Sequence, residues 1–294
     1  MVGLVIGRQR RAWWLLTPFL VGALVLFVIP ALLTFGLAFT EYDAISAPKW
    51  NGLENFKQVY NDELFPIALK NTLYFTAIAI PLRLLGALAL ALLLSQKRKG
   101  FGLYRAAAYL PTVIPDVAYA LIWLWIFNPL YGPLNVILEG LRFDRAAWLV
   151  EPSSAKNALI LMSLFQVGEG FVVMLAGRRD IPSEYYDSVK VFGGDAWQGF
   201  MRVTLPLLAP WMLLLIARDV VMSFQYSFTY TYLMTGGDPY YSTLFMPLLA
   251  YEEAFDRFRF GPGSAIMLFI FVSSCSVVWV LYRGFRRLGY IDTK

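Results

Sequence analysis

The chain contains six apolar stretches, and each is long enough to cross a lipid bilayer. A membrane-spanning helix needs about 20 largely apolar residues to cross a hydrocarbon core about 30 Å thick. With 59% hydrophobic and only 15% charged residues, the chain is also far more apolar than a soluble domain. We therefore expect an all-α integral membrane protein with six transmembrane helices. Their expected ranges are residues 13–38, 71–94, 106–128, 157–176, 207–230 and 264–283.

The Lys and Arg residues between these stretches are concentrated on one side of the expected membrane. They lie before the first stretch, around residues 97–105, between the fourth and fifth stretches, and after the sixth. Basic residues are enriched in cytoplasmic loops, so their distribution indicates orientation. It predicts that both termini and the segment 177–206 are cytoplasmic. The loops 42–70, 128–156 and 235–263 then lie outside.

The residue inventory excludes several classes of function. The chain has no His and one Cys, which excludes internal disulfides, Cys/His zinc sites and His-based acid–base catalysis. We therefore expect no metal site and no catalytic residue. The phosphate-binding pattern GxxxxGK[ST] does not occur, so this chain is expected to bind no ATP or other cofactor itself. The net charge of +5 does not indicate nucleic-acid binding, because the basic residues flank the apolar stretches.

The segment 177–210 is a polar island between the fourth and fifth apolar stretches. Tyr185, Val189 and Phe192 recur at helical spacing and predict a short helix with one apolar face. Gly193–Gly194 is expected to end it, because glycine tolerates the left-handed backbone at a helix C-terminus. So short a helix needs tertiary packing to persist. Two interpretations stay open, namely an amphipathic loop on lipid headgroups and a helix that inserts into a partner's groove.

Capping signals refine this helix–glycine–helix prediction. Asp180 or Ser183 is expected to cap the first helix, because short polar side chains satisfy the free backbone N–H groups of a helix start. Asp195 is expected to cap a second helix for the same reason. Pro206 and Pro210 are expected to mark its exit into the fifth membrane span.

Charged residues inside the apolar stretches are costly to insert and are therefore candidates for function. They are Arg83, Asp116, Glu169, Arg218 and Asp219. One interpretation is a cavity whose carboxylates, amides and aromatic rings contact a solute. The alternative is that the charges pair across helices. The candidate residues for the solute pathway are Asp116, Tyr119, Trp123, Gln166, Glu169, Gln225 and Tyr226.

The polar island also carries a family resemblance. IPSEYYDSVKVFGGDAWQGFMRVTLPLL resembles the cytoplasmic EAA loop of binding-protein-dependent ABC importer permeases of the carbohydrate, maltose/trehalose-like type. GLENF, LKNTLYFT, YRAAAYLPTVIPDVAYALIWLWIFNPLYGPLN and YLMTGGDPYYST resemble further segments of that family, so the likeness covers nearly the whole chain. The loop departs from the family pattern at Asp187-Ser188-Val189, where Glu-Ala-Ala is usual, and at Phe192, where Asp is usual.

The resemblance implies the type I importer permease fold in a prokaryotic inner membrane. It implies a second homologous permease, two ABC ATPase subunits that hold ATP and Mg²⁺, and an extracytoplasmic binding protein that delivers a di- or oligosaccharide. It also assigns a surface for ATPase docking, where Gly193 permits the turn. The docking residues are Glu184, Tyr185, Asp187, Ser188, Val189, Phe192 and Gly193.

Three alternatives remain at this stage. The same machinery could import a polyol or a glycerophosphodiester, whose phosphate would meet Arg83 or Arg218. A secondary transporter would predict internal repeats with broken helices, and no convincing repeat is visible. A membrane enzyme would need a paired acid–base motif or a cluster of metal ligands, and the sequence shows neither.

Overall fold

The structure, a computed structural model, describes residues 2–96 and 98–289, and the side chains of residues 2–12 and 224–226 lie outside the described part. The chain divides into two compact units. The first comprises residues 1–62 and 250–269, and the second comprises residues 63–249 and 270–294.

The described part of the chain is mostly helical, which confirms the expected fold class. Four of its helices are long and apolar enough to cross a membrane, and six spans result if each of two bent helix pairs is one span. The four are Trp13–Leu37, Leu64–Leu94, Ala196–Met234 and Phe260–Arg287. The two bent pairs are Phe101–Val113 with Asp116–Ile126, and Pro152–Gln166 with Gly168–Asp180.

The first unit combines a long apolar helix with a small polar cap. The apolar helix includes one π-helical turn, η1, between α1 and α2. In the cap, the short strands β1 and β2 pair antiparallel, with Thr40 opposite Trp50 and Glu41 opposite Lys49. The elements are α1 (Val2–Ala23), η1 (Leu24–Val28), α2 (Ile29–Leu37), β1 (Thr40–Glu41), β2 (Lys49–Trp50), α3 (Glu54–Asn61), η5 (Glu252–Asp256) and the start of α14 (Phe260–Arg287).

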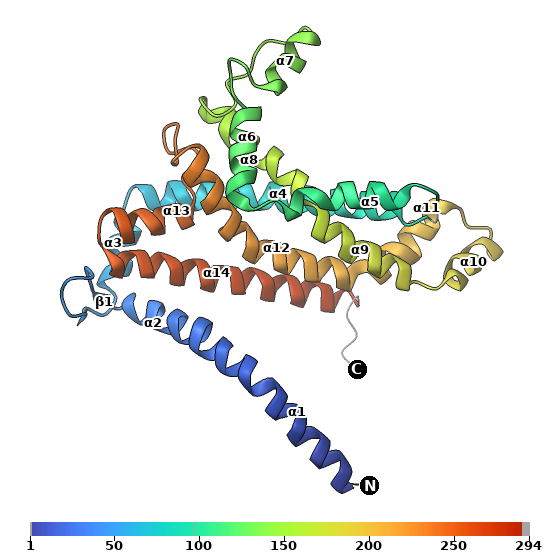
Figure 1. Ribbon diagram of the computed structural model, residues 1–294, viewed down its shortest axis with the longest axis horizontal. Helices are drawn as coiled ribbons and strands as arrows, with labels where there is room; N and C mark the ends of the chain where they lie inside the picture. Colours follow the sequence, from blue (N-terminus) through green and yellow to red (C-terminus); the bar gives the residue numbers. More distant parts are fainter. Residues whose placement is uncertain (1, 97, 290–294) are drawn as a thin grey trace. The chain divides into compact units, whose positions relative to one another are not determined.

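In the second unit, three long helices pack side by side, namely α4, α9 and α12 (Figure 1). Close approach of α9 to α12 depends on Gly177, since a Cβ atom there would lie 2.7 Å from the Trp211 ring. The elements are α4 (Leu64–Leu94), α5 (Phe101–Tyr109), η2 (Leu110–Val113), α6 (Asp116–Ile126), α7 (Pro133–Gly140), α8 (Pro152–Ser163), η3 (Leu164–Gln166), α9 (Gly168–Asp180), α10 (Ser183–Val191), α11 (Ala196–Gly199), η4 (Phe200–Thr204), α12 (Leu205–Met234) and α13 (Met246–Tyr251).

The third apolar stretch is not the single helix that its pattern predicts over 106–128. It forms two helical segments that meet at 100°, at the extended residues Ile114 and Pro115. A proline disfavours the helical backbone of the residue before it, and its ring prevents the helix from continuing. Figure 1 shows α6 standing at a steep angle to α5. Asp116 therefore lies in the first turn of a new helix and not in the middle of a span.

The fifth span begins earlier than expected. We expected Pro206 to mark a boundary, but the helix runs from Ala196 to Met234 without a break. The π-helical turn η4 (Phe200–Thr204) precedes Pro206, which lies in the first turn of α12. A π-turn changes the backbone hydrogen-bonding pattern, and proline is tolerated in a first turn because it has no N–H to donate. The polar island is thus continuous with a membrane span.

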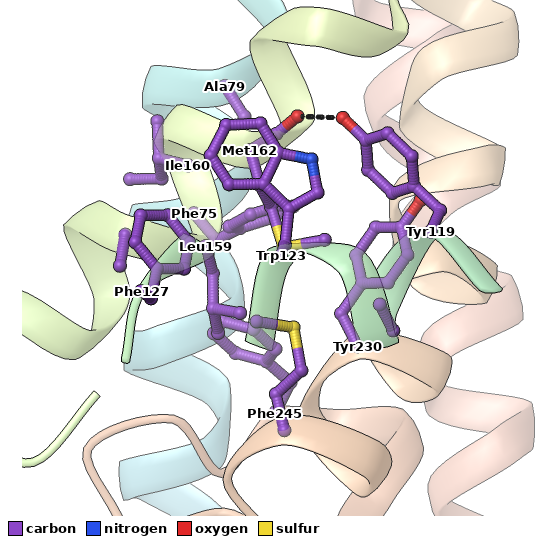
Figure 2. Packing of buried hydrophobic residues seen from close by; sticks show 13 residues of the cluster. Phe75, Ala79, Tyr119, Trp123, Phe127, Leu159, Ile160, Met162, Tyr230 and Phe245 are labelled. Carbon is purple, nitrogen blue, oxygen red and sulfur yellow. Dashed lines mark hydrogen bonds between the residues drawn. The ribbon is translucent and has the colours of Figure 1, made fainter. Parts of the chain in front are cut away.

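Aromatic side chains form the core around α6, α8 and α12, as Figure 2 shows. The Trp123 ring contacts both Phe127 and Phe165, with ring centroids 5.0 Å apart in each pair. The Tyr119 hydroxyl donates to the Met162 carbonyl at 2.6 Å, near the C-terminal end of α8. This bond satisfies a buried tyrosine and a carbonyl close to a bend in the chain.

Two neighbouring residues of α4 hold the loop that follows α12. Asn71 donates to the carbonyls of Tyr241 (2.8 Å) and Leu244 (3.0 Å), and it accepts from Lys156 at 3.1 Å. The Thr72 hydroxyl accepts from the Met246 amide at 2.9 Å. Motifs about 170 residues apart, KNT and GGDPYYST, therefore form one structural feature.

Candidate functional site

The first candidate site is the polar island, which folds as α10, a glycine turn and α11. Gly193 has a φ of +74°, and its N–H donates to the Lys190 carbonyl at 2.9 Å. The Gly194 N–H donates to the Val189 carbonyl at 2.8 Å, which completes a Schellman motif. The Asp195 carboxylate accepts from the Gln198 N–H at 2.8 Å. The predicted glycine stop and the Asp195 cap are both confirmed.

The predicted cap of the first helix is wrong. The capping position of α10 is Pro182, and no side chain accepts from the free N–H groups there. Asp180 is instead the last residue of α9, and Ser183 is already the first residue of α10. The carboxylate of Glu184 still lies in the first turn, where it interacts favourably with the helix dipole.

Tyr186, which is not among the predicted docking residues, attaches α10 to the rest of the unit. Its hydroxyl lies 2.8 Å from the Thr204 hydroxyl, at the end of η4. The Arg178 guanidinium lies over its ring, 4.4 Å from the centroid, so the last turn of α9 contacts the same side chain. A short helix that is weak alone is thereby fixed to both neighbouring helices.

The docking residues named from the sequence are mostly on the surface. Phe192 is 91% exposed and Tyr185 is 52% exposed, whereas Val189 is half-buried against the body of the loop. Asp187 is exposed and pairs with Lys190 at 2.9 Å, and the Ser188 hydroxyl donates back to the Glu184 carbonyl. Val191, which was not on the predicted face, is 83% exposed. The apolar tip of the loop is therefore Tyr185, Val191 and Phe192.

The second candidate site is a charged cluster between α4, α9 and α12. Arg83 pairs with Asp219 at 3.3 Å, and Arg218 reaches the same carboxylate oxygen at 3.0 Å. Arg218 also forms an ion pair with Glu169. Arg83 and Asp219 are buried, whereas Glu169 and Arg218 are partly exposed. The cluster carries two positive and two negative charges, so it is neutral.

The void that the described residues enclose beside this cluster is small. A void of about 10 Å³ is lined by Arg83, Gln166, Arg218 and neighbouring apolar residues. That volume is close to what one water molecule needs and far below a typical ligand pocket of about 300–1,000 Å³. In this conformation the charges satisfy one another across helices, which is the pairing alternative raised by the sequence.

The remaining pathway residues divide between the polar surroundings of this cluster and the core. The Gln166 oxygen accepts from the Tyr230 hydroxyl, and Asp116 is half-buried. Tyr119 and Trp123 belong to the aromatic core and are 3% and 7% exposed. The side chains of Gln225 and Tyr226 lie outside the described residues.

Comparison with known proteins identifies the class of this chain. Residues 84–288 match the family described as "Binding-protein-dependent transport system inner membrane component". The chain belongs to this family. It is thus the membrane-embedded permease of an ABC importer that works with a binding protein.

Several relatives of this permease span nearly the whole chain. The probable ABC transporter permease YesP of Bacillus subtilis is 35% identical over 273 residues, which are 91% of this chain and 88% of that protein. The trehalose/maltose permease MalF of Thermococcus litoralis is 28% identical and covers 95% of this chain and 96% of its own. The sulfoquinovosyl glycerol permease SmoG of Agrobacterium fabrum is 28% identical, with 96% and 92% covered.

Solved structures establish the fold. A chain of a bacterial ABC transporter that imports the acidic polysaccharide alginate superposes with a TM-score of 0.81 at 23% identity. The match covers 100% of this chain and 99% of that one. The permease therefore has the type I ABC importer fold, as the sequence predicted.

Proposed function

We propose that this permease pairs with a second, homologous permease and imports a di- or oligosaccharide across a prokaryotic inner membrane. In this proposal an extracytoplasmic binding protein delivers the saccharide, and two ABC ATPase subunits supply the energy by hydrolysing ATP with Mg²⁺. Both termini and α10 face the cytoplasm, where the basic residues are concentrated.

The observation that carries the proposal is the apolar tip of α10. The side chains of Tyr185, Val191 and Phe192 are apolar or aromatic and are exposed at this tip. Exposed apolar side chains on a short helix are what a helix uses to bind in a partner's groove. Tyr186 joins α10 to α9 and η4 through the contacts described above. A displacement of α10 by the ATPase would therefore be transmitted to two membrane helices, as rigid-body switching requires.

The test compares three variants in the assembled transporter. Phe192→Asp places a charge at the apolar tip, and Gly193→Pro imposes a negative φ where the turn needs +74°. We expect both to reduce ATPase co-purification and saccharide uptake by at least tenfold. Tyr60→Asp, at another exposed aromatic residue, which lies in α3 and is 77% exposed, is the matched control.

Two outcomes would count against α10 as the docking helix. Normal co-purification and uptake in Phe192→Asp and Gly193→Pro would refute it directly. Loss of co-purification in Tyr60→Asp as well would show that any added charge has this effect. If α10 instead lay on lipid headgroups, Phe192→Asp would leave the ATPase in the complex.

The ion pairs of the two interior arginines favour a saccharide over a glycerophosphodiester as the solute. In this conformation Arg83 and Arg218 both form ion pairs with carboxylates, so neither guanidinium is available to a bound phosphate. The names of relatives point the same way, since they include trehalose/maltose and starch-degradation-product permeases. A competition assay with maltose, trehalose, glycerol and glycerophosphocholine on uptake would separate these solutes.

For the solute pathway we propose Asp116, Gln166, Glu169, Gln225 and Tyr226 as polar contacts, with Tyr119 and Trp123 forming the wall behind them. Glu169 and Arg218 would separate to open the pathway, because they form the more exposed pair of the cluster. We expect Glu169→Ala and Gln225→Ala to weaken the apparent affinity for the saccharide. Unchanged apparent affinity in both variants would refute this assignment.

A further inference from the structure

The polar cap of the first unit contains a pocket that the transport mechanism above does not use. It has a volume of about 390 Å³, within the range of small-ligand sites. The loop after β1 forms one wall, α3 forms the second, and the residues just before α14 form the third. The lining side chains that carry the argument are Glu41, Asp43, Lys49, Asn51, Asn55 and Arg259.

The amide donors of this pocket are mostly used within the protein. Asn55, which is 2% exposed, donates both N–H groups, to the Ala38 carbonyl at 2.9 Å and the Thr40 carbonyl at 2.8 Å. The Asn51 side-chain N–H donates to the Asn55 oxygen at 3.2 Å. Asn55 therefore has no side-chain N–H left for a ligand, and one N–H of Asn51 is used within the protein.

Acceptors remain available. The Asn51 side-chain oxygen is buried and accepts no hydrogen bond from any described residue. A buried oxygen without a partner is costly, so its presence beside a pocket points to a donor that is supplied from outside. The Glu41 carboxylate likewise has no ion-pair partner in the described part of the chain.

The charges of the pocket favour a cation. Arg259 is occupied, since it pairs with the buried Glu253 at 3.2 Å and donates to Gln58 at 3.0 Å. Asp43 holds a turn by accepting from the Ser46 and Ile45 amides, and these bonds, the one from Ser46 foremost, keep the pKa of its carboxyl below the ordinary value. Lys49 also lines the pocket, and its positive charge would repel an incoming cation.

We propose that this pocket receives a Lys or Arg side chain of the extracytoplasmic binding protein. Ammonium and guanidinium groups donate hydrogen bonds and accept none, which matches a site of free acceptors and carboxylates. A saccharide hydroxyl both donates and accepts, and Asn55, the most buried amide of the pocket, has no N–H left to donate to it. The proposal rests on the proposed function, which places the cap outside the membrane and assigns the binding protein as partner.

The test measures docking in the whole transporter, reconstituted in lipid nanodiscs with its binding protein. The readout is the binding-protein concentration that gives half-maximal stimulation of ATPase activity. Glu41→Gln combined with Asp43→Asn removes both charges and keeps the oxygen that holds the turn. We expect this concentration to rise at least fivefold and to depend less on salt, because complementary charges steer association.

Lys49→Gln is the matched variant of opposite sign. It removes the competing positive charge from the same pocket, and we expect it to lower the half-saturating concentration. Basal ATPase activity should stay unchanged in all variants, because none of the substituted residues belongs to the proposed ATPase-docking surface. A photo-cross-linking residue at Ser46 should capture a binding-protein peptide that contains Lys or Arg at the contact.

The outcomes separate this proposal from the proposed function. Strong stimulation of the wild type, with unchanged half-saturation in both charge variants, would overturn the pocket assignment alone. No stimulation of the wild type by any binding protein would overturn both. Protection of Ser46→Cys, in a Cys275→Ser background, by maltose or trehalose without the binding protein would identify a saccharide occupant and also overturn the assignment.

Discussion

The Tyr186 hydroxyl lies 2.8 Å from the Thr204 hydroxyl and thereby joins the short helix α10 to the helix that continues into the membrane as α12. Between these two residues the chain makes its glycine turn and begins again at the Asp195 cap. The loop is thus closed on itself at its base, while Phe192 stays exposed at its tip. Because the base is fixed, a displacement of the exposed tip would be transmitted to the helix that continues as α12.

Tyr186→Phe tests this link. The substitution removes one hydroxyl and keeps the ring, so the contact with Arg178 survives. We expect a loss of about 0.5–1.5 kcal/mol in the free energy of unfolding, typical of one hydrogen bond. We also expect fewer solute molecules transported per ATP hydrolysed, because α10 is held less firmly to α12.

The measurement is uptake and ATPase activity on the same proteoliposomes, with Tyr60→Phe as the matched control. Tyr60 is a tyrosine of α3 that is 77% exposed and lies outside the proposed docking surface. Equal coupling ratios in wild type and Tyr186→Phe would show that the hydroxyl pair is not needed for transmission.

The shape of this loop could be predicted from the sequence because its signals are local. Glycine tolerates a positive φ and aspartate caps a helix whatever surrounds them, so Gly193 and Asp195 were identified correctly. The inward position of Tyr186 was not predicted. Helical spacing groups Tyr185, Val189 and Phe192 on one face, but only contact with Thr204, 18 residues later, decides which face turns toward the protein.

The interior charges illustrate a second limit. Hydropathy identifies Arg83, Glu169, Arg218 and Asp219 as unusual, but it contains no information on which pairs meet. Arg83 and Asp219 are 136 residues apart and pair only because α4 and α12 pack together. Likewise, the break between α5 and α6 follows from Pro115, and the mean hydropathy of a window of residues does not reveal a single proline.

Asn71→Ala tests the anchor of the loop after α12. The variant loses two donated hydrogen bonds and leaves the Tyr241 and Leu244 carbonyls without that partner. At about 1 kcal/mol for each bond we expect a loss of about 2 kcal/mol, seen as a lower midpoint of thermal unfolding in detergent. Asn61→Ala, at an exposed residue ending α3, should leave the midpoint unchanged. Equal midpoints in wild type and Asn71→Ala would contradict the anchor.

The ion pair of Glu139 with Arg145 predicts a pH dependence in the loop after α6. The hydrogen bond from the Arg145 guanidinium lowers the pKa of the Glu139 carboxyl. A carboxyl whose pKa is lower in the folded state adds stability above its ordinary pKa and loses that contribution as pH falls through the folded pKa. Wild type should therefore unfold at a higher temperature than Glu139→Gln at pH 7.

This difference should shrink below pH 4.5, the ordinary pKa of the group, as Glu139 becomes protonated. Thermal unfolding of both proteins between pH 7 and pH 3 measures it. Glu63→Gln, at an exposed carboxylate before α4 with no ion pair in the described part of the chain, is the control. A difference that stays constant over this range would show that the ion pair is not its source.

The charged cluster predicts unequal costs for its two cross-helix pairs. Arg83→Gln leaves Asp219 buried with Arg218 as its remaining cation, and removing one partner of a buried pair typically costs about 3–5 kcal/mol. Glu169→Gln disturbs a partly exposed pair, for which a cost of about 1 kcal/mol or less is typical. We therefore expect a clearly lower unfolding midpoint for Arg83→Gln than for Glu169→Gln.

A double variant separates charge from packing in the same cluster. Arg83→Met combined with Asp219→Leu replaces the buried pair with apolar side chains and leaves Arg218 paired with Glu169. Such replacements are often neutral for stability, so the double variant should regain most of what Arg83→Gln loses. Equal midpoints for Arg83→Gln and Glu169→Gln, or a double variant less stable than Arg83→Gln, would show that burial does not set the cost. If stability recovers while uptake does not, the charges serve transport and not the fold.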